Sequence, residues 1–407
     1  MRILYLSQLI PYPADAGPKV RSYHVIQHLA ARGHKVTLVA FKRKSDRAAD
    51  IEHMRQYCVD VRCVPMARSR ARDLWYLGRS LLCSEPFLIV RDLVAAMHET
   101  IDEALSQCEF DVIHADQLWM AQYALAARKR IESEEYAPYL VLDQHNAVFL
   151  ISQRLAENSS NLLVQRILKR EASLLEHYER RVCAQFDRVV WVTDEDQRAL
   201  TSTANDRCTS ASGVIIPICI NPDEKRVIQR LPHARRVTFL GGLHWPPNAD
   251  GIRRFAYEVW PRIIEQAPTA LLTIIGKDPP DDLVSAVIPG IEVSGFVRDL
   301  LPYLRETAVF IVPLHAGGGM RVKIIDAWSW GLPIVSTTIG AEGLAYRDGE
   351  NLLLADAAET FAGAVVRILS DAELGQRLGA AGRATVEKCY DWRHVYGAWD
   401  TVYRQGP

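Results

Sequence analysis

The stretch HAGGGMRVKIIDAWSWGLPIVS, from His315 to Ser336, decides how this chain is interpreted. Its three consecutive glycines, Gly317–Gly319, leave backbone N–H groups open to a ligand because no side chain covers them. A helix is predicted to follow, and the positive end of its dipole then points at whatever the glycines hold. Gly-Leu-Pro closes the helix before the next apolar run. The pattern predicts an anion-binding loop between a strand and a helix.

Three charged residues follow the glycines at short spacing. Arg321 and Lys323 stand at the predicted helix start, where a guanidinium fork and an ammonium group both suit phosphate oxygens. Asp326 lies about one to two turns further on, where a carboxylate would repel phosphate but accept hydrogen bonds from ribose hydroxyls. A simple loop followed by surface charges is the alternative. The pattern G-x-G-x-x-G is absent, which disfavours dehydrogenase chemistry.

Length and composition favour an ordinary globular protein with two domains. The chain has 407 residues, 49% of them hydrophobic, and a formal net charge of −1. One core rarely organises so long a chain, and the charge balance gives no reason to expect a nucleic-acid partner. The eight cysteines include no C-x-x-C pair, so reduced thiols are expected rather than a zinc site. Without a signal-peptide pattern or an apolar run of about 20 residues, a cytoplasmic location is expected.

Apolar strands alternate with amphipathic helices along most of the chain, which predicts an α/β fold with two doubly wound, Rossmann-like domains. We expect an N-terminal domain over residues 1–220, a second domain over 221–388, and a C-terminal helix in 389–407 that packs back on the first domain. Residues 221–236 form the predicted linker. The predicted strands are Ile3–Ser7, Lys35–Phe41, Val59–Val64, Asp111–His114, Tyr139–Leu142 and Arg188–Val192, then Val237–Gly241, Ala270–Ile275, Ile291–Gly295, Ala308–Pro313 and Pro333–Thr337.

Two stretches of the first domain lie outside this alternation. Residues 68–92 are rich in Arg, Leu, Trp and Phe, and are predicted to form one or two helices. Packing against the core is one interpretation, and peripheral contact with a membrane surface is the other. Residues 150–183 contain no Pro or Gly and are predicted to form one or two long helices.

Several polar residues follow predicted strands of the first domain, at the sheet edge where ligands bind in such folds. His145 and Asn146 come after the fifth strand, and Asp116 and Gln117 come after the fourth. We expect His145 to act in the site. Asp116, Gln117 and Asn146 are candidates for the acceptor side.

Taken in order, these motifs resemble glycosyltransferase family 4, in particular bacterial sugar transferases of exopolysaccharide and cell-envelope biosynthesis. The resemblance rests on LSQLIPYPADAGPKVRSYHVIQHLAARGHKVTLV, VLDQHNAVFLISQRL, FLGGLHWPPNADGIRRF, IEVSGFVRDLLPYL, GGGMRVKIIDAWSWGLPIVST and IGAEGL, and covers nearly the whole chain. It implies the glycosyltransferase B (GT-B) fold, with two facing domains and a deep cleft between them. It also implies metal-independent transfer, with retention, from a nucleotide-diphosphate sugar, UDP- or GDP-linked, and no cofactor.

The resemblance assigns roles at matching positions of the second domain. Asp326 occupies the place of the second Glu of the family's E-x7-E pattern, which binds ribose. The first Glu of that pattern, a contact of the donor sugar, falls on Gly318, so the family's rule for sugar choice does not carry over. Backbone N–H groups of Gly318 and Gly319 are expected to serve there, with Arg321 and Lys323 supplying positive charge.

Two further backbone sites follow from the same resemblance. Gly295, Phe296 and Val297 stand where the family binds the base through backbone groups. Gly17, in Asp15-Ala16-Gly17, matches the glycine loop over the diphosphate, and Lys19 and Arg21 on the next helix are candidates to assist it.

The expected reaction is therefore glycosyl transfer, with His145, Arg321 and Lys323 as the catalytic set. Acceptors that fit the resemblance are a glycan, a lipid-linked sugar or a small molecule, the last implying tailoring of a natural product. Peripheral association with the inner membrane face through 68–92 would accompany a lipid-linked acceptor. A sugar-nucleotide epimerase and a catalytically silent sugar-nucleotide-binding protein are the alternatives, the latter because the first Glu is missing.

Overall fold

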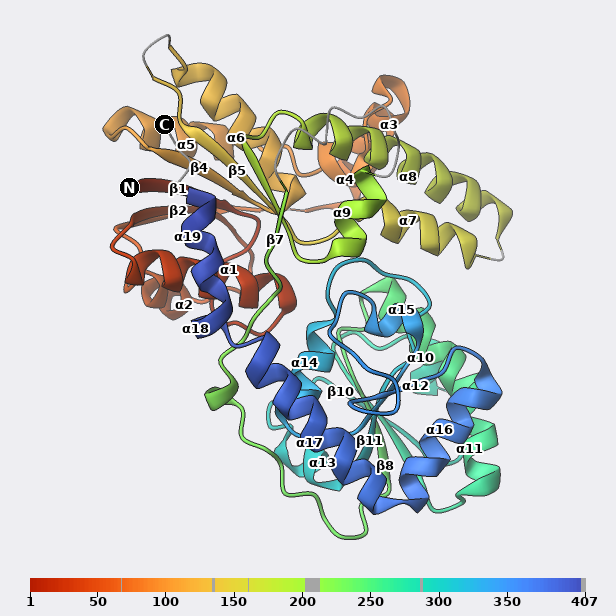
Figure 1. Cartoon of the computed structure of the whole chain (residues 1–407). Helices are drawn as coiled ribbons and strands as arrows, with labels where there is room; N and C mark the ends of the chain where they lie inside the picture. The colour runs from red at the N-terminus through yellow and green to blue at the C-terminus, as the bar shows by residue number, and fades with distance from the viewer. Residues whose placement is uncertain (67, 134–135, 160, 202–212, 286–287, 404–407) are drawn as a thin grey trace. The chain divides into compact units, whose positions relative to one another are not determined.

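A computed structural model describes residues 1–66, 68–133, 136–159, 161–201, 213–285 and 288–403 (Figure 1). The chain divides into two compact units, Met1–Ile220 with the segment from Trp392 onward, and Asn221–Asp391. Each contains a parallel sheet of the doubly wound type. The seven described cysteines are free thiols, and Cys208 lies outside the described residues.

The first unit is built on a seven-stranded parallel sheet in the order β3-β2-β1-β4-β5-β6-β7. The strands are β1 (Arg2–Ser7), β2 (Lys35–Lys42), β3 (Asp60–Pro65), β4 (Val112–Asp116), β5 (Tyr139–Gln144), β6 (Arg188–Trp191) and β7 (Val214–Ile215). The helices are α1 (Gly17–Ala31), α2 (Ala48–Met54), α3 (Arg70–Cys83), α4 (Phe87–Val90), α5 (Ala95–Gln107), α6 (Leu118–Ile131), α7 (Val148–Glu157), α8 (Leu162–Cys183) and α9 (Asp194–Thr201). The strand order reverses between β1 and β4, the switch point where ligands bind in such sheets.

The sheet of the first unit is buried on both faces, as its apolar strands predict. Leu4 and Leu6 of β1 point into one core, whereas Ile3 and Tyr5 point into the other. The second core also contains residues of the chain's end, which forms α18 (Trp392–Val395), a short 3₁₀ turn and α19 (Trp399–Tyr403). Trp399 and Tyr403 are almost fully buried there. The C-terminal segment thus completes the core of the first unit.

The second unit has a six-stranded parallel sheet in the order β10-β9-β8-β11-β12-β13. The strands are β8 (Arg236–Leu240), β9 (Leu271–Ile275), β10 (Ile291–Gly295), β11 (Thr307–Val312), β12 (Ile334–Ser336) and β13 (Leu353–Leu354). The helices are α10 (Pro246–Arg254), α11 (Trp260–Gln266), α12 (Asp281–Ser285), α13 (Leu301–Glu306), α14 (Val322–Ser329), α15 (Thr338–Ala341), α16 (Ala358–Ser370) and α17 (Ala372–Cys389). The switch point here lies between β8 and β11.

Two boundary differences from the sequence-based expectation affect the site. The strand expected over Asp111–His114 continues to Asp116, so Asp116 is a strand residue rather than a loop residue. The helix expected after Asp15-Ala16-Gly17 already includes Gly17, and Pro18 lies in its first turn, where a missing N–H costs nothing. Arg21 lies on the buried side of this helix.

Candidate active site

The glycine-rich loop of the second unit connects the end of β11 to α14, as predicted. Gly317 and Gly319 have φ values of 144° and 66°, which side chains with a Cβ rarely adopt. A Cβ at Gly317 would also lie 2.9 Å from Nη2 of Arg321. The backbone conformation thus favours glycine at both positions, and Arg321 packs against Gly317.

Arg321 folds back onto this loop instead of facing solvent. Its Nη1 donates to the carbonyl oxygen of Gly318 at 2.7 Å and also to that of Gly319, and Nη2 donates to Ile339 O at 3.0 Å. Its side chain is only 6% exposed. Arg321, which the sequence predicts as a source of positive charge for the ligand, therefore has a structural role as well. Its charge remains beside the loop, but its hydrogen bonds hold the loop together.

Lys323 lies on α14, and its ammonium group reaches the end of β8. Its Nζ donates to Asn248 Oδ1 at 2.7 Å and sits 4.6 Å from the centre of the Phe239 ring. A Cβ on Gly241 would lie 2.7 Å from Nζ, so Gly241 makes room for the ammonium group. Burial, and to a smaller extent the nearby Arg321, lowers the pKa of Lys323 to about 7. An incoming diphosphate would reverse that shift.

Asn248 is a site residue that sequence reasoning missed. It lies on α10, and its Nδ2 donates to Gly242 O at 2.8 Å while its Oδ1 receives the Lys323 bond. The amide thus fixes Lys323 against the loop after β8. The quoted motif GGLHWPPNADG contained it, but nothing in the spacing marked it.

Asp326 lies on α14, and its carboxylate forms an ion pair with Lys225. Its side chain is 23% exposed, so it stays partly accessible. Ribose binding by Asp326 remains a prediction, in which the hydroxyls would share the carboxylate with Lys225.

The predicted base site lies at the end of β10. Gly295 has a φ of 65°, and its carbonyl accepts a hydrogen bond from Gly276 N at 2.8 Å. Phe296 is 61% exposed, and Nζ of Lys277 lies 4.7 Å from the centre of its ring. Val297 follows, part-buried. Because the strands are parallel, the ends of β8, β10 and β11 lie at one edge of the sheet, so these residues share that edge.

In the first unit the polar residues after β4 and β5 form a buried ionic cluster. His145 Nε2 lies 2.9 Å from Asp116 Oδ1 and 3.5 Å from Asp143 Oδ2. Arg21 of α1 contacts both oxygens of Asp143 at 2.8 Å through Nε, and Asp143 Oδ1 at 2.6 Å through Nη2. Arg21 therefore balances Asp143 in the core, and the expectation that it serves a surface phosphate site is wrong.

Asp116 is a partner of His145 rather than a group that faces an acceptor. It is fully buried, and besides His145 it receives hydrogen bonds from Ser7 Oγ at 2.8 Å and Ser22 Oγ at 2.9 Å. The acceptor contact expected for Asp116 is thus corrected. The physical reason is the extra length of β4, which carries the carboxylate into the sheet.

The cluster favours the protonated form of His145. Burial alone would lower the pKa of His145, but Asp116 and Asp143 outweigh it and raise the pKa above its ordinary value. Its Nδ1 has no hydrogen-bond partner among the described residues. His145 can therefore act as a proton donor toward a ligand, whereas its neighbour His114 is neutral because burial lowers the pKa of His114 to about 4.

Gln117 follows Asp116 with a φ of 72°, a conformation rare for a residue with a Cβ. Its Nε2 is buried and has no hydrogen-bond partner among the residues that the structure describes. Backbone strain and an unsatisfied amide often mark functional positions. Gln117 remains a candidate contact, as does the part-exposed Asn146 beside His145.

Gly17 is the first residue of α1 and is part-exposed. Neither Gly17 nor Ala16 provides a side-chain cap, so backbone N–H groups of the first turn are left for other partners. Lys19 pairs with Asp15 at 3.3 Å. The diphosphate role of Gly17 stays a prediction.

One group of side chains has the composition of a metal site. His114, Asp116 and Asp143 place one possible ligand atom each within 4.8 Å of one another. However, Arg21 touches both oxygens of Asp143, and Tyr403 OH lies 2.7 Å from His114 Nδ1. A guanidinium at this distance repels a cation and already balances the carboxylate, so the arrangement fits an internal ion pair better than a metal.

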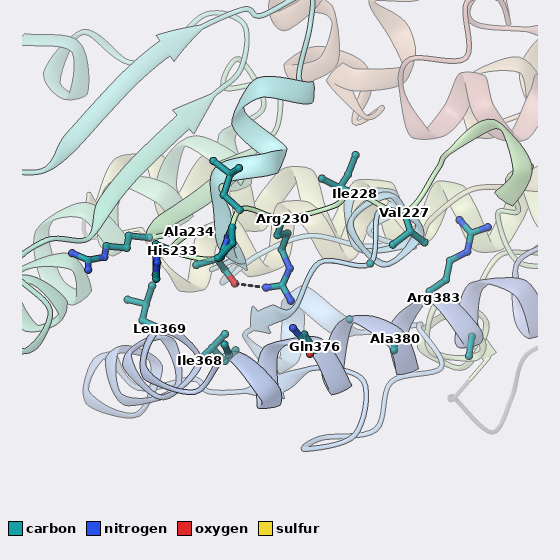
Figure 2. A pocket seen from close by; sticks show the side chains of 18 of the residues that line it. Val227, Ile228, Arg230, His233, Ala234, Ile368, Leu369, Gln376, Ala380 and Arg383 are labelled. Atoms are coloured by element: carbon teal, nitrogen blue, oxygen red, sulfur yellow. Dashed lines mark hydrogen bonds between the residues drawn. The ribbon is translucent and has the colours of Figure 1, made fainter.

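A cavity of about 640 Å³ in the second unit lies at the other end of the sheet (Figure 2). Its wall combines the segment Val227–Arg235, which precedes β8, with residues of α16 and α17 and with Ala308 at the start of β11. Arg230 lines it and donates to Ala308 O at 3.5 Å. The cavity therefore adjoins the amino ends of the strands, away from the glycine-rich loop.

Comparison with known proteins identifies the family of this chain. The description "Glycosyltransferase Family 4" matches residues 17–224, and "Glycosyl transferases group 1" matches residues 234–371. The first match alone covers half of the chain. The chain belongs to glycosyltransferase family 4, and its two α/β units are those of the GT-B fold.

Individual relatives are distant. An uncharacterized 44.6 kDa protein in the cps region of Klebsiella pneumoniae is 20% identical over 98% of both chains. The lipopolysaccharide core biosynthesis glycosyltransferase LpsE of Rhizobium meliloti is 29% identical, over 33% of this chain and 42% of LpsE.

Solved structures share the fold at low identity. Sucrose-phosphate synthase of Thermosynechococcus elongatus has a TM-score of 0.70 at 16% identity, covering 100% of this chain and 99% of that one. Anabaena Alr3699/HepE in complex with UDP-glucose has a TM-score of 0.66 at 13% identity, covering 99% of both.

Proposed function

We propose that this glycosyltransferase takes its sugar from a nucleotide-diphosphate sugar and transfers it with retention, without a metal. The observation that carries the proposal is the loop between β11 and α14 in the second unit. It combines glycine N–H groups, a helix start and Lys323, whose pKa burial lowers to about 7, at one edge of the sheet. UDP-glucose in the HepE structure supports a donor of this class.

The chemistry follows from where charge develops. As the glycosidic bond to the diphosphate breaks, negative charge grows on the leaving phosphate, and fixed N–H groups and cations stabilise it most where water is excluded. Lys323 has lost much of its hydration already, so its interaction with the leaving group is strong. We propose that the leaving phosphate accepts the acceptor's proton on the same face, which retains the anomeric configuration.

His145 is proposed to donate a hydrogen bond to the substrate as an imidazolium. Asp116 and Asp143 keep it protonated, and Arg21 keeps Asp143 ionised. The proposed catalytic set is therefore His145 with Lys323, and Arg321 shapes the loop. Membership of family 4 favours a transferase over the epimerase alternative.

The acceptor is proposed to belong to the cell envelope, as a glycan or a lipid-linked sugar. LpsE acts in lipopolysaccharide core biosynthesis, and the Klebsiella relative is encoded in a cps region. No described helix is long and apolar enough to span a bilayer.

Helices α3 and α8 provide a surface of the right kind. Leu74, Trp75, Leu81 and Leu82 of α3 are 59–88% exposed, and Leu162, Leu163 and Ile167 of α8 are 54–71% exposed. Arg170 of α8 donates to Ser80 O of α3 at 2.8 Å, so the two helices adjoin. The proposed membrane surface therefore extends from residues 68–92 to the first turns of α8.

Charge on these helices favours an anionic bilayer. Helix α3 contains three Arg and one Asp, and residues 162–170 contain two Arg and one Lys. A cation that faces an anionic bilayer contributes about 1 kcal/mol, and the exposed apolar side chains add their burial. We propose that this face binds the membrane that holds the acceptor.

The test of the donor is calorimetry and thermal shift against UDP, GDP, ADP and their sugar conjugates, with EDTA and then with magnesium. Metal-independent binding that is lost in Lys323→Met supports the proposal. Binding without turnover over a broad acceptor panel would instead favour the silent binding protein, and no binding at all would refute the donor class.

The test of the surface is flotation with vesicles of phosphatidylglycerol and, separately, of phosphatidylcholine alone. Trp75→Ser with Leu82→Ser should abolish binding to the anionic vesicles, whereas Val59→Ser, at a side chain 66% exposed elsewhere in the unit, should not. Unchanged flotation of the double variant, or concentration-dependent dimers that the double variant abolishes, would contradict the membrane assignment.

A further inference from the structure

The candidate site for the nucleotide sugar offers hydrogen-bond donors, but Gly318 offers no side-chain acceptor for the sugar's hydroxyl groups. The loop Gly317–Gly319 contributes N–H groups, and Arg321 and Lys323 are cations. A sugar, however, carries hydroxyl groups that donate as well as accept. Gly318 has no side chain to receive them.

Glu342 brings a carboxylate to this loop from another element. It follows α15 (Thr338–Ala341), and its Oε2 lies 3.8 Å from Nη2 of Arg321. The same guanidinium donates to Gly318 O at 2.7 Å, so Glu342 and Gly318 share one arginine. The Glu342 side chain is 24% exposed, against 6% for Arg321, so the carboxylate is the accessible member of the pair.

The backbone before Glu342 is held tightly against the same sheet edge. Thr337 Oγ1 accepts a hydrogen bond from Gly340 N at 2.9 Å and caps α15. A Cβ on Gly340 would lie 2.6 Å from Val312 O and 2.5 Å from Ser336 Oγ, at the ends of β11 and β12. Helix α15 therefore sits directly on these strand ends, and the position of Glu342 is set by packing.

We propose that Glu342 binds a hydroxyl of the transferred sugar, in place of the side chain that Gly318 lacks, and thereby selects the donor sugar. The inference rests on the proposed function, since it needs a nucleotide-sugar donor. Arg321 then has two tasks: it fixes the loop, and it holds the Glu342 carboxylate beside Gly318, oriented toward the sugar.

A purely structural role for Glu342 makes a different prediction. If Glu342 only orients Arg321, its loss disturbs the diphosphate site and weakens every nucleotide equally. If Glu342 holds the sugar, its loss weakens the nucleotide sugar and spares the nucleoside diphosphate. The ratio of the two affinities separates the roles.

The experiment measures calorimetric Kd values for UDP and UDP-glucose, and for GDP and GDP-mannose, with wild type, Glu342→Gln and Glu350→Gln. Glu350 is an exposed control that also pairs with an arginine, at 3.4 Å from Arg347. In Glu342→Gln we expect the sugar conjugate to bind about 10- to 100-fold more weakly, as for a lost charged hydrogen bond, and the diphosphate within about twofold. Glu350→Gln should match wild type.

A deoxy-sugar series with the pair that binds then locates the hydroxyl. The analogue that lacks the bound hydroxyl should lose affinity for wild type but show no further loss with Glu342→Gln. Equal weakening of diphosphate and conjugate in Glu342→Gln would overturn the inference while leaving the donor proposal intact. If wild type binds neither pair, the donor proposal falls, and the inference falls with it.

Discussion

Raising the pH from 7 to 9 should weaken binding of the nucleotide sugar about 50-fold, because Lys323 loses its proton. Burial lowers the pKa of Lys323 to about 7, so the free protein is half protonated at pH 7 and about 1% protonated at pH 9. A bound diphosphate stabilises the ammonium form and returns its pKa toward the ordinary value of about 10.4. Affinity then follows the protonated fraction of the free protein.

The direction of the pH effect on binding follows from the number of protons bound in each state. Over this range the complex holds more protons than the free protein, so binding takes up a proton and a rise in pH opposes it. The 50-fold loss corresponds to about 2.3 kcal/mol. Uptake should be about half a proton per ligand at pH 7 and should approach one at pH 9.

The assay is calorimetry in pairs of buffers with different ionisation enthalpies, using UDP-glucose or GDP-mannose, whose diphosphates do not titrate in this range. Lys323→Met should bind weakly at pH 7 and show no proton uptake above pH 7. Lys277→Met, at an exposed lysine beside Phe296, should keep the wild-type slope. An unchanged slope in Lys323→Met would refute the reasoning, since the titrating group would then lie elsewhere.

Three further predictions concern charges whose partners the structure reveals. Arg321→Ala should lower the stability of the second unit by about 1–3 kcal/mol in scanning calorimetry, because three carbonyl oxygens lose their hydrogen-bond donor. It should also weaken binding of the nucleotide sugar. An unchanged unfolding temperature would contradict this prediction. Arg21→Met should cost the first unit about 3–5 kcal/mol in urea unfolding by leaving Asp143 uncompensated, and Asp143→Leu in the same chain should recover part of it; no recovery would argue against the ion pair. Asp116→Asn should lower the pKa of His145 in an NMR titration. The pKa of His145 is higher in the folded protein than its value of about 6.5 in the unfolded chain, so the His145–Asp116 pair stabilises the fold fully below about pH 6.5. This contribution is lost as the pH rises through the folded pKa, and it should therefore be largest in acid.

Most of the fold could be predicted because its signals are local. The buried parallel strands are short apolar runs, and Leu4 and Ile3 of β1 face opposite cores, so the run shows no polar side. Helix and strand ends are weaker signals. The error of two residues at β4 mattered, because it placed Asp116 in a loop instead of in the sheet.

The positions of the candidate site residues could be predicted, but the directions of their charged side chains could not. Arg21 and Asp143 are 122 residues apart, and only the strand order β1-β4-β5 brings α1 over the end of β5. An arginine near a helix start therefore has the same sequence pattern whether it faces a phosphate or a buried carboxylate. Asn248 escaped notice for the same reason, since its partner Lys323 comes from α14.

Arg321 and Lys323 show how a two-residue spacing can divide two tasks between neighbouring cations. Arg321 makes several hydrogen bonds to carbonyls of its own unit and is enclosed by them, so its charge is fixed but its donors are engaged. Lys323 makes one hydrogen bond to an amide, and its pKa is about 7. The free site therefore holds only about half of the lysine's positive charge at pH 7, and a bound phosphate raises it to a full charge. An arginine could not replace it, because a guanidinium does not release its proton in this range. The variant Lys323→Arg should therefore bind the nucleotide sugar without the pH dependence of wild type, even if it binds with appreciable affinity. A wild-type dependence of affinity on pH in this variant would show that Lys323 is not the titrating group.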